Sequence, residues 1–357
     1  MMKKPLLLLL LTLSVIILSS CAFQMNSFSR SYTYFDSYET ITFWTSKSES
    51  SVIEYFNKTN DILKLYHNLT NRYEDTGVNG VYYLNNHPDT VVTVDKELIN
   101  LLSEVKMFLS KNDQEVFSSF TIGIGKISDI WHDTFEKYNE ASSCEKEKIK
   151  ELPKIDSSPV NTNINDIKID KENSTVRLEN GVSIDLGGVV KGYVSKVLID
   201  YYNENNLKYT IDMGQSNIYT NIGNPKRKNN AYIIGLKDPS ASCTEELAIY
   251  AKLTLPLNKS IVTSGDYQKY FTYNGKIYSH ILDSSTKMPV DTDIRSISII
   301  IDDPFIGDIY STVLFMKDIT KALEIVNSNE NLECIIYGLD NRIYTSFGIN
   351  DYIEIIK

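Results

Sequence analysis

The chain contains few cysteines, and their spacing excludes two common uses of this residue. Only four occur in 357 residues, and one of them, Cys21, lies within the N-terminal segment. The others are Cys144, Cys243 and Cys334, which are far apart and odd in number, so they form neither a disulfide framework nor a Cys-x-x-Cys zinc site. We expect buried thiols, with one disulfide among the three left open.

Histidine and positive charge are also scarce. The four histidines, His67, His87, His132 and His280, include no close pair and no His-Glu-x-x-His motif, which argues against a transition-metal site. A hard cation held by oxygen atoms remains open. Acidic side chains outnumber basic ones, 46 to 36, and the formal net charge is −10. Because the chain has no basic field, we expect no nucleic-acid partner.

The N-terminus has the features of a lipoprotein signal. Lys3 and Lys4 precede an apolar run over residues 5–18, which is short of the ~20 residues that span a bilayer. Small residues then lead to Cys21. We therefore expect residues 1–20 to be a signal peptide and the mature chain to be lipid-anchored through Cys21 at the extracytoplasmic face of the cell membrane. A cleaved, unlipidated signal peptide with an incidental cysteine is the alternative.

The remaining pattern indicates a tether over residues 21–33 and one large α+β unit of mixed sheets and helices over residues 34–357. Strands are predicted at 38–46, 208–213, 231–236, 248–253, 276–280, 295–301 and 333–346, with a hairpin from residue 167. Helices are predicted at 51–66, 93–109, 189–204, 307–316 and 319–327, with Asp95 as the cap of the second, and residues 137–165 are predicted as a surface loop.

A Gly-Gly turn before the predicted helix 189–204 is the first candidate for chemistry. Residues 185–192 read Asp-Leu-Gly-Gly-Val-Val-Lys-Gly. The glycines let the backbone approach a ligand closely, and a helix start presents free N–H groups to an anion. Lys191 opposes the helix dipole, which makes sense if an anion binds there. The segment is neither a Walker loop nor a dinucleotide motif, and a Gly-Gly turn alone is usually only a turn.

Three later segments carry groups that suit phosphate and magnesium chemistry. Residues 263–267 read Thr-Ser-Gly-Asp-Tyr and form a small polar turn after an apolar strand, and His280 lies three residues before Asp283. Asp308 and Thr312 are four residues apart, so they share one face of a predicted helix and supply half of an oxygen shell for Mg²⁺. Taken singly, each segment also fits an ordinary structural role, such as a helix start or a core histidine.

In their order along the chain, these segments resemble the motifs of the ApbE family, the FAD:protein FMN transferases. The family's Asp-x-Gly-Gly-x-x-Lys-Gly motif corresponds to residues 185–192, and its Thr-Ser-Gly-Asp-Tyr, His-Ile-x-Asp and Asp-x-x-x-Thr motifs correspond to 263–267, 280–283 and 308–312. Gly125, Trp131 and the pair Leu84-Asn85 match further elements, and the resemblance covers about residues 33–330.

The chain departs from the family pattern at three places. Residues 284–287 read Ser-Ser-Thr-Lys in place of Pro-Arg-Thr-Gly, residues 214–216 read Gly-Gln-Ser where a second Gly-Gly is usual, and Lys126 replaces a proline after Gly125. No metal-binding or proton-transfer group is lost. The departures concern the contacts to the flavin and the preference for an acceptor.

The resemblance implies transfer of FMN from FAD, the substrate, to a Ser or Thr hydroxyl of an extracytoplasmic acceptor protein, with release of AMP. It implies Mg²⁺ on Asp308, Thr312 and the backbone carbonyl of Val190, and His280 as the base. Lys191 would balance phosphate charge. Asp266 and Asp283 would orient neighbours or hold a second cation. The residues implied to bind FAD are Asn85, Asp185, Gly187, Gly188, Lys191, Ser264, Gly265, Asp266, His280 and Asp283.

The residues leave alternatives open. With water as the acceptor, the same site would make the protein an Mg²⁺-dependent FAD pyrophosphatase that yields FMN and AMP. A lipoprotein that binds a flavin or another solute without catalysis is a second alternative, which the joint presence of His280, Asp308 and Thr312 opposes. Modification of the chain itself at residues 238–242, Asp-Pro-Ser-Ala-Ser, is a third.

Overall fold

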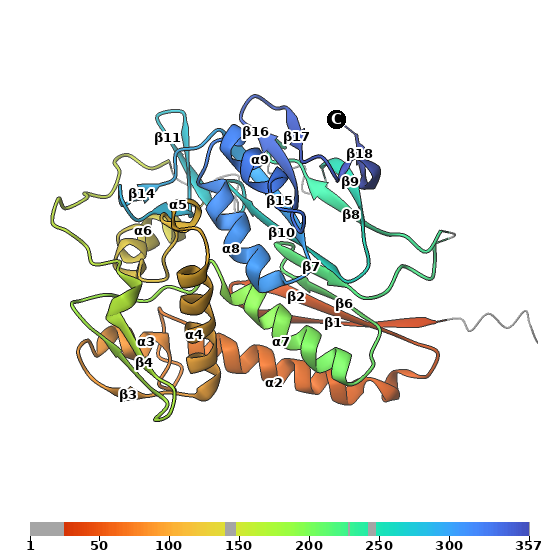
Figure 1. The fold of residues 1–357 in the computed structure, drawn as a ribbon, viewed down its shortest axis with the longest axis horizontal. Helices are drawn as coiled ribbons and strands as arrows, with labels where there is room; N and C mark the ends of the chain where they lie inside the picture. Colours follow the sequence, from red (N-terminus) through yellow and green to blue (C-terminus); the bar gives the residue numbers. More distant parts are fainter. Residues whose placement is uncertain (1–24, 140–147, 228, 242–247, 357) are drawn as a thin grey trace, which may run out of the picture.

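The structure, a computed structural model, describes residues 25–139, 148–227, 229–241 and 248–356. Its centre is an eight-stranded sheet in which every neighbouring pair is antiparallel (Figure 1). The strands, in spatial order, are β1 (Asn26–Tyr34), β2 (Ser37–Thr45), β6 (Tyr209–Met213), β7 (Asn217–Thr220), β10 (Lys259–Gly265), β15 (Ile294–Ile301), β16 (Glu333–Gly338) and β17 (Ile343–Thr345).

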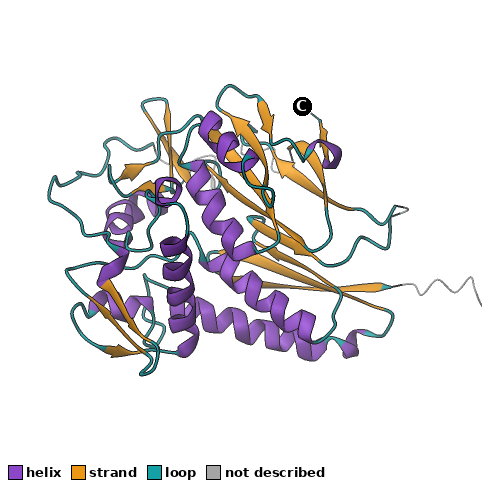
Figure 2. Cartoon of the chain, in the orientation of Figure 1, coloured by secondary structure: helices purple, strands orange, loops and turns teal. Residues whose placement is uncertain are grey.

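Helices cover one face of this sheet, and a small second sheet packs on the other (Figure 2). The helices on the sheet are α2 (Ile53–Thr70), α7 (Val190–Glu204), α8 (Pro304–Phe315) and α9 (Ile319–Asn327). The second sheet has the order β18 (Ile353–Ile355), β9 (Ile249–Leu255) and β8 (Tyr232–Lys237). Mixed sheets with helices on one side confirm the predicted α+β class.

Smaller elements surround this body. They are η1 (Glu49–Ser51), α3 (Val81–Asn86), β3 (Val92–Thr93), α4 (Lys96–Lys111), α5 (Gln114–Phe117), α6 (Gly125–Tyr138), η3 (Ile164–Asp166), β4 (Ile167–Asp170), β5 (Thr175–Leu178), the hairpins β11 (Tyr270–Tyr273) with β12 (Lys276–Ser279) and β13 (Leu282–Asp283) with β14 (Met288–Pro289), and η4 (Asn350–Tyr352). Strands β3, β5 and β4 form a sheet of their own.

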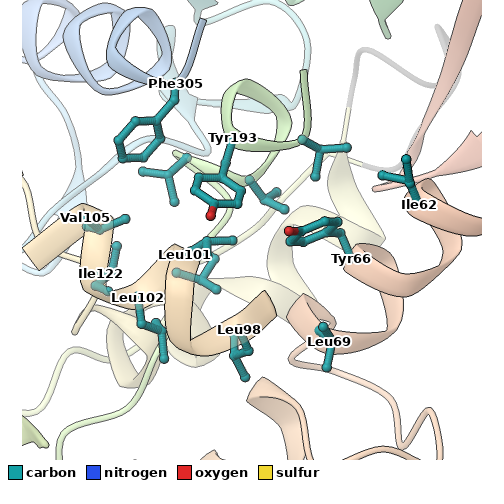
Figure 3. Close-up of a cluster of buried hydrophobic side chains, with 14 of the residues drawn as sticks. Ile62, Tyr66, Leu69, Leu98, Leu101, Leu102, Val105, Ile122, Tyr193 and Phe305 are labelled. Carbon is teal, nitrogen blue, oxygen red and sulfur yellow. The ribbon is translucent and has the colours of Figure 1, made fainter. Parts of the chain in front are cut away.

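The main core lies between α2, α4 and α7 (Figure 3). Helix α4 contributes the predicted apolar stripe, which includes Leu98, Leu101 and Leu102, and its predicted cap Asp95 accepts a hydrogen bond from the Glu97 N–H. Tyr193 of α7 packs edge-on against Phe305 of α8, with ring centroids 5.6 Å apart. This core therefore fixes the start of α7 against α8.

Most predicted elements form, and two predictions are wrong. The polar turn expected at residues 263–267 begins too early, because residues 263–265 pair within strand β10. Residues 26–33, assigned to the tether, belong to strand β1. Along this strand exposed Ser29, Ser31 and Thr33 alternate with partly buried residues, and the hydroxyl of Tyr32 donates a hydrogen bond to the backbone of α2. The alternation is the period-2 pattern of a strand that buries one face, and the polar composition hid it.

The predictions for the N-terminus and for two of the cysteines fall on residues 1–24, 140–147 and 242–247, which lie outside the described residues. In the part that the structure describes, no helix combines the length and apolarity needed to cross a membrane. Cys334 has a free thiol, as expected, and its burial raises the pKa to about 12.

Candidate active site

The Gly-Gly segment and helix α8, which are far apart in the sequence, meet at the ends of strands β6 and β10. The backbone N–H of Gly192 donates a hydrogen bond to Oδ2 of Asp308 over 2.8 Å. A Cβ atom at Gly192 would lie only 2.3 Å from the carbonyl oxygen of Pro304 and 2.7 Å from Cβ of Asp308. Only glycine therefore allows α7 and α8 to cross this closely.

The three predicted metal ligands belong to the two helices that cross here, Val190 to α7, and Asp308 and Thr312 to α8. Val190 is the first residue of α7 and is buried, and the hydroxyl of Thr312 donates to the carbonyl oxygen of Asp308, one turn earlier in α8, over 3.1 Å. A Cβ atom at Gly188 would lie 3.7 Å from Oγ1 of Thr312. Among the described residues, no group of three or more His, Cys, Asp or Glu side chains could hold a metal ion.

Asp308 is a partly buried carboxylate, and few neighbouring groups offset the cost of its burial. Its desolvation raises the pKa to about 7, and the Gly192 N–H and the Lys191 charge offset only part of this effect. Among the described residues, the hydrogen bond from Gly192 is the one hydrogen bond found for this carboxylate. The group is thus poised between its charged and neutral forms near neutral pH.

Lys191 extends from the first turn of α7 toward Gly214, which follows β6. Its Nζ atom lies 3.6 Å from the position that a Cβ of Gly214 would take. Burial lowers the pKa of Lys191, and four carboxylates act in the opposite direction: Asp308, Glu39, Asp36 and Asp212. No hydrogen bond or ion pair to the Lys191 ammonium is found among the described residues.

His280 follows strand β12, and the backbone carbonyl of Lys269 fixes it from two sides. That oxygen accepts a hydrogen bond from the His280 N–H over 3.0 Å and lies 3.2 Å from Nδ1 of the ring. If the proton is on Nδ1, Nε2 is left as an acceptor. The ring is exposed to solvent on one side. Desolvation by the protein around its other sides lowers the pKa, and charges on Lys191 and Asp185 lie within electrostatic reach.

Asp185 and Asn85 are engaged in holding the segment before the Gly-Gly turn. Oδ1 of Asp185 accepts from the Gly187 N–H over 2.8 Å. The Asn85 amide clamps Ile184, accepting from its N–H over 2.7 Å and donating to its carbonyl over 2.9 Å. Both predicted FAD-binding side chains thus set the course of the backbone that leads into the turn.

The remaining predicted residues are also tied into the protein. Ser264, at the end of β10, donates to Oγ of Ser311 in α8, one residue before Thr312. Asp266 forms a buried ion pair with Arg295, with N–O distances of 3.1 and 3.2 Å. The preceding residue, Gly265, is buried at the end of β10.

Asp283 makes a turn of its own with Ser285. The Asp283 Oδ1 atom accepts hydrogen bonds from the backbone N–H and the hydroxyl of Ser285, both over 2.7 Å. Neither Asp266 nor Asp283 therefore directs a free carboxylate at the Asp308 region, which fits the predicted orienting role.

Two cavities flank the site. A groove of about 350 Å³ lies beside Asp283, and a cavity of about 130 Å³ lies beside Gln215 and Thr263, between the two sheets. The groove is lined by Ser119, Lys276, Tyr278, Asp283, Thr286, Met288, Pro289, Val290, Asp291, Met316 and Lys317. Its lining mixes apolar side chains with polar ones and with charges of both signs.

Sequence reasoning missed three charged residues of the site. Arg72, which follows α2, is buried and donates hydrogen bonds to the carbonyl oxygens of Gly125 and Ile184. These bonds hold the backbone just before the Gly-Gly turn. Glu39 and Asp212 face Lys191 from strands β2 and β6. For Glu39 a signal existed, since this charge stands in phase with the buried apolar residues of its strand.

Comparison with known proteins places the fold. The family model described as the ApbE family matches residues 35–336. The FAD:protein FMN transferase of Klebsiella pneumoniae (strain 342) is 27% identical over 289 residues, 80% of this chain and 82% of that protein. The one of Treponema pallidum (strain Nichols) is 23% identical over 273 residues, 74% of this chain and 72% of that protein.

Solved structures agree in fold over nearly the whole chain. The ApbE protein from Thermotoga maritima has a TM-score of 0.69 at 22% identity, covering 92% of this chain and 99% of that one. The flavin transferase ApbE from Vibrio cholerae has a TM-score of 0.68 at 15% identity, covering 92% and 100%.

Asp308→Asn is expected to stabilise the protein at pH 8 but not near pH 4. The ordinary pKa of an aspartate is 3.8 and that of Asp308 in the fold is about 7, so between these values the folded state keeps a proton that the unfolded state releases. Stability from this carboxyl is therefore full at low pH and is lost as the pH rises toward 7. We expect a gain of about 1–3 kcal/mol at pH 8, measured by urea denaturation. An equal change at both pH values would contradict the raised pKa.

Proposed function

The chain belongs to the ApbE family, as its motifs predicted, and on this premise we propose that it transfers FMN from FAD to a Ser or Thr hydroxyl of an acceptor protein, with release of AMP. Similar proteins along most of the chain are named FAD:protein FMN transferases. The observation that carries the proposal is the convergence of Lys191 and Asp308 at the crossing of α7 and α8 with His280 within electrostatic reach.

The proposed reaction is a substitution at phosphorus. The acceptor oxygen attacks the phosphorus of the FMN half, a new P–O bond forms, and the bond to the bridging oxygen breaks, so that AMP leaves with that oxygen. The acceptor proton goes to Nε2 of His280. Such a reaction needs alignment and charge neutralisation more than covalent chemistry by the protein. The lowered pKa of His280 keeps the ring neutral at pH 7, as a proton acceptor must be.

We propose Mg²⁺ as the required cation, held by the Asp308 carboxylate, the Thr312 hydroxyl and the Val190 carbonyl. These are the hard oxygen donors that Mg²⁺ prefers, and three protein ligands leave positions for phosphate and water. Asp308 has spare acceptor capacity beyond its bond to Gly192. The glycine at position 188 also leaves space in front of Thr312. When bound, the ion supplies charge neutralisation at the pyrophosphate.

The other residues of the site bind and orient FAD in this proposal. Lys191 places its ammonium beside the pyrophosphate, and the Gly187-Gly188 turn, held by Asp185, brings backbone N–H groups close to it. The groove beside Asp283 suits a flat ring system, because Tyr278 and two methionines line it. Ser264 and Asp266 support this arrangement through Ser311 and Arg295.

Hydrolysis is a second candidate function. The His280 ring is exposed, so water can reach the base in the absence of an acceptor protein. The same site would then act as an FAD pyrophosphatase, with water in place of the hydroxyl.

We further propose that Cys21 carries a lipid anchor that holds the enzyme at the extracytoplasmic face of the cell membrane, where acceptor proteins of that compartment are its partners. The basic residues, the apolar run and the small residues before Cys21 support this proposal.

Incubating the purified protein with FAD, Mg²⁺ and candidate extracytoplasmic proteins is expected to add the mass of FMN to the acceptor. Intact-mass spectrometry measures the adduct, and EDTA should abolish it because the pyrophosphate charge is then not neutralised. Release of free FMN and AMP with an unmodified acceptor would decide for hydrolysis, and full transfer in EDTA would reject the metal proposal.

His280→Asn is expected to keep FAD affinity near that of the wild type while lowering the rate of transfer by roughly 10²–10⁴-fold, the range for a lost general base. Single-turnover rates, FAD affinity and thermal stability are measured on one preparation. A full rate of transfer in the variant would refute the assigned role, and parallel losses in affinity and stability would indicate a structural histidine.

Cys21→Ser is expected to leave the protein unprocessed or soluble, since a serine provides no thioether for the acyl chains that give membrane affinity. Fractionation of cells with mass spectrometry of the N-terminus checks this, and Cys334→Ser is the control that should behave as wild type. A Cys21→Ser protein that is still lipidated would disprove the anchor site.

A further inference from the structure

Glu39 is a charge buried inside the main sheet. Its exposed fraction is 0%, and in β2 it lies on the same face as Ile41 and Phe43, whose side chains are buried in the core beneath the helices. Its partner across the sheet is Met213 of β6. Burial of an ionised carboxylate is costly unless hydrogen bonds and an opposite charge compensate it. The residues around Glu39 therefore indicate what this charge is for.

Hydrogen bonds within its own hairpin anchor the carboxylate. Oε1 accepts from the hydroxyl of Ser37 over 2.6 Å, and Oε2 accepts from the backbone N–H of Tyr34 over 3.0 Å. Both donors lie at the turn between β1 and β2, whose two central residues, Phe35 and Asp36, have positive φ angles. The carboxylate is thus fixed in place, but neither donor carries a positive charge.

Lys191 is the cation that faces this carboxylate. A Cβ atom at Gly214 would lie 2.7 Å from Oγ of Ser37 and 3.6 Å from Nζ of Lys191, so the hairpin turn and the ammonium both lie next to Gly214, where a larger residue would stand between them. Burial raises the pKa of Glu39 and lowers the pKa of Lys191, and the charge of each residue offsets part of this effect on the other. No ion pair is formed at contact distance within the described residues.

We propose that Glu39 is a positioning residue, a fixed buried charge that holds the Lys191 side chain beside Gly214 so that its ammonium is in place when the pyrophosphate of FAD arrives. The proposal rests on the proposed function for the role of Lys191, but the interaction itself exists in the protein without ligand. Because Glu39 is anchored by Ser37 and Tyr34, it orients the lysine without closing a contact pair that the substrate would have to break.

The proposal predicts that removal of the Glu39 charge weakens FAD binding, the opposite of what charge repulsion alone would give. A negative charge near an anion site opposes binding of FAD by simple repulsion, so its removal alone should tighten binding. A positioning role predicts the reverse: Glu39→Gln should weaken FAD binding by roughly tenfold, within the range of coupling between neighbouring residues. In a Lys191→Met background the same substitution should no longer weaken it.

A double-mutant cycle tests the interaction without any ligand. Wild type, Glu39→Gln, Lys191→Met and the double variant are compared by urea denaturation. Because Lys191→Met leaves the buried Glu39 charge without its cation, Glu39→Gln should be more favourable to stability in that background than in the wild type. Additive changes would overturn the proposal.

Glu333→Gln is the matched control. Glu333 also accepts from a serine hydroxyl, that of Ser346, and from a backbone N–H, that of Gly348, but it lies in β16, away from Lys191. Its replacement should be additive with Lys191→Met and leave FAD affinity unchanged. Coupling of the same size in the control would overturn the assignment to Glu39.

FAD affinity of the four variants, from flavin fluorescence without acceptor, completes the test. Tighter or unchanged binding in Glu39→Gln would overturn the positioning role even if the stability cycle shows coupling. If the wild type binds FAD but transfers no FMN, the proposed function fails while both cycles still decide on Glu39.

If Glu39→Gln does not fold, Ser37→Ala takes its place. This variant removes one of the two hydrogen bonds that anchor the carboxylate, and additivity with Lys191→Met would again reject the proposal.

Discussion

The hydrogen bond from the Gly192 backbone to Asp308 is the interaction on which the site depends. It exists because α7 and α8 cross without a side chain between them, and a Cβ at Gly192 would press on both the backbone and the side chain of α8. The same region sets Gly188 near Thr312 and directs the Lys191 side chain toward Gly214, after strand β6. A single close approach of two backbones therefore brings together groups that lie more than a hundred residues apart in the chain.

Burial of the charged groups of the site costs free energy, which the packing of the surrounding fold offsets. Burial raises the pKa of Asp308 and lowers that of Lys191, so the charged form of each group is less stable than it would be in water. Two sets of contacts support the site. The rings of Tyr66, Tyr193 and Phe305 pack together beside α7, and Arg72 donates hydrogen bonds to the backbone at Gly125 and Ile184. A pyrophosphate and a cation, bound as proposed, would bring opposite charges to these groups and so offset part of the cost of their burial.

The segments that carry local signals could be predicted, and the long-range partners could not. The predicted helix 319–327 has the bounds of α9, and residues 185–192 and 308–312 could be singled out from the glycine turn, the residue spacing and the resemblance to the ApbE motifs. The Asn85 amide was expected to bind FAD, but it clamps Ile184, because a pairing between residues 99 positions apart leaves no periodic trace. Strand β1 could not be predicted because its partly buried positions carry Phe28, Arg30, Tyr32 and Tyr34 rather than aliphatic side chains, so that composition concealed the alternation.

Strand β1 also sets a distance. Its tip at Tyr34 lies at the site, while Asn26 begins at the other end of nine paired residues, about 30 Å away at the rise of an extended strand. Only four residues, 22–25, separate that end from Cys21. With an anchor at Cys21, the length of β1 together with these residues would set the greatest distance between the lipid surface and the site. Acceptor hydroxyls that lie farther from the bilayer than this span would be out of reach.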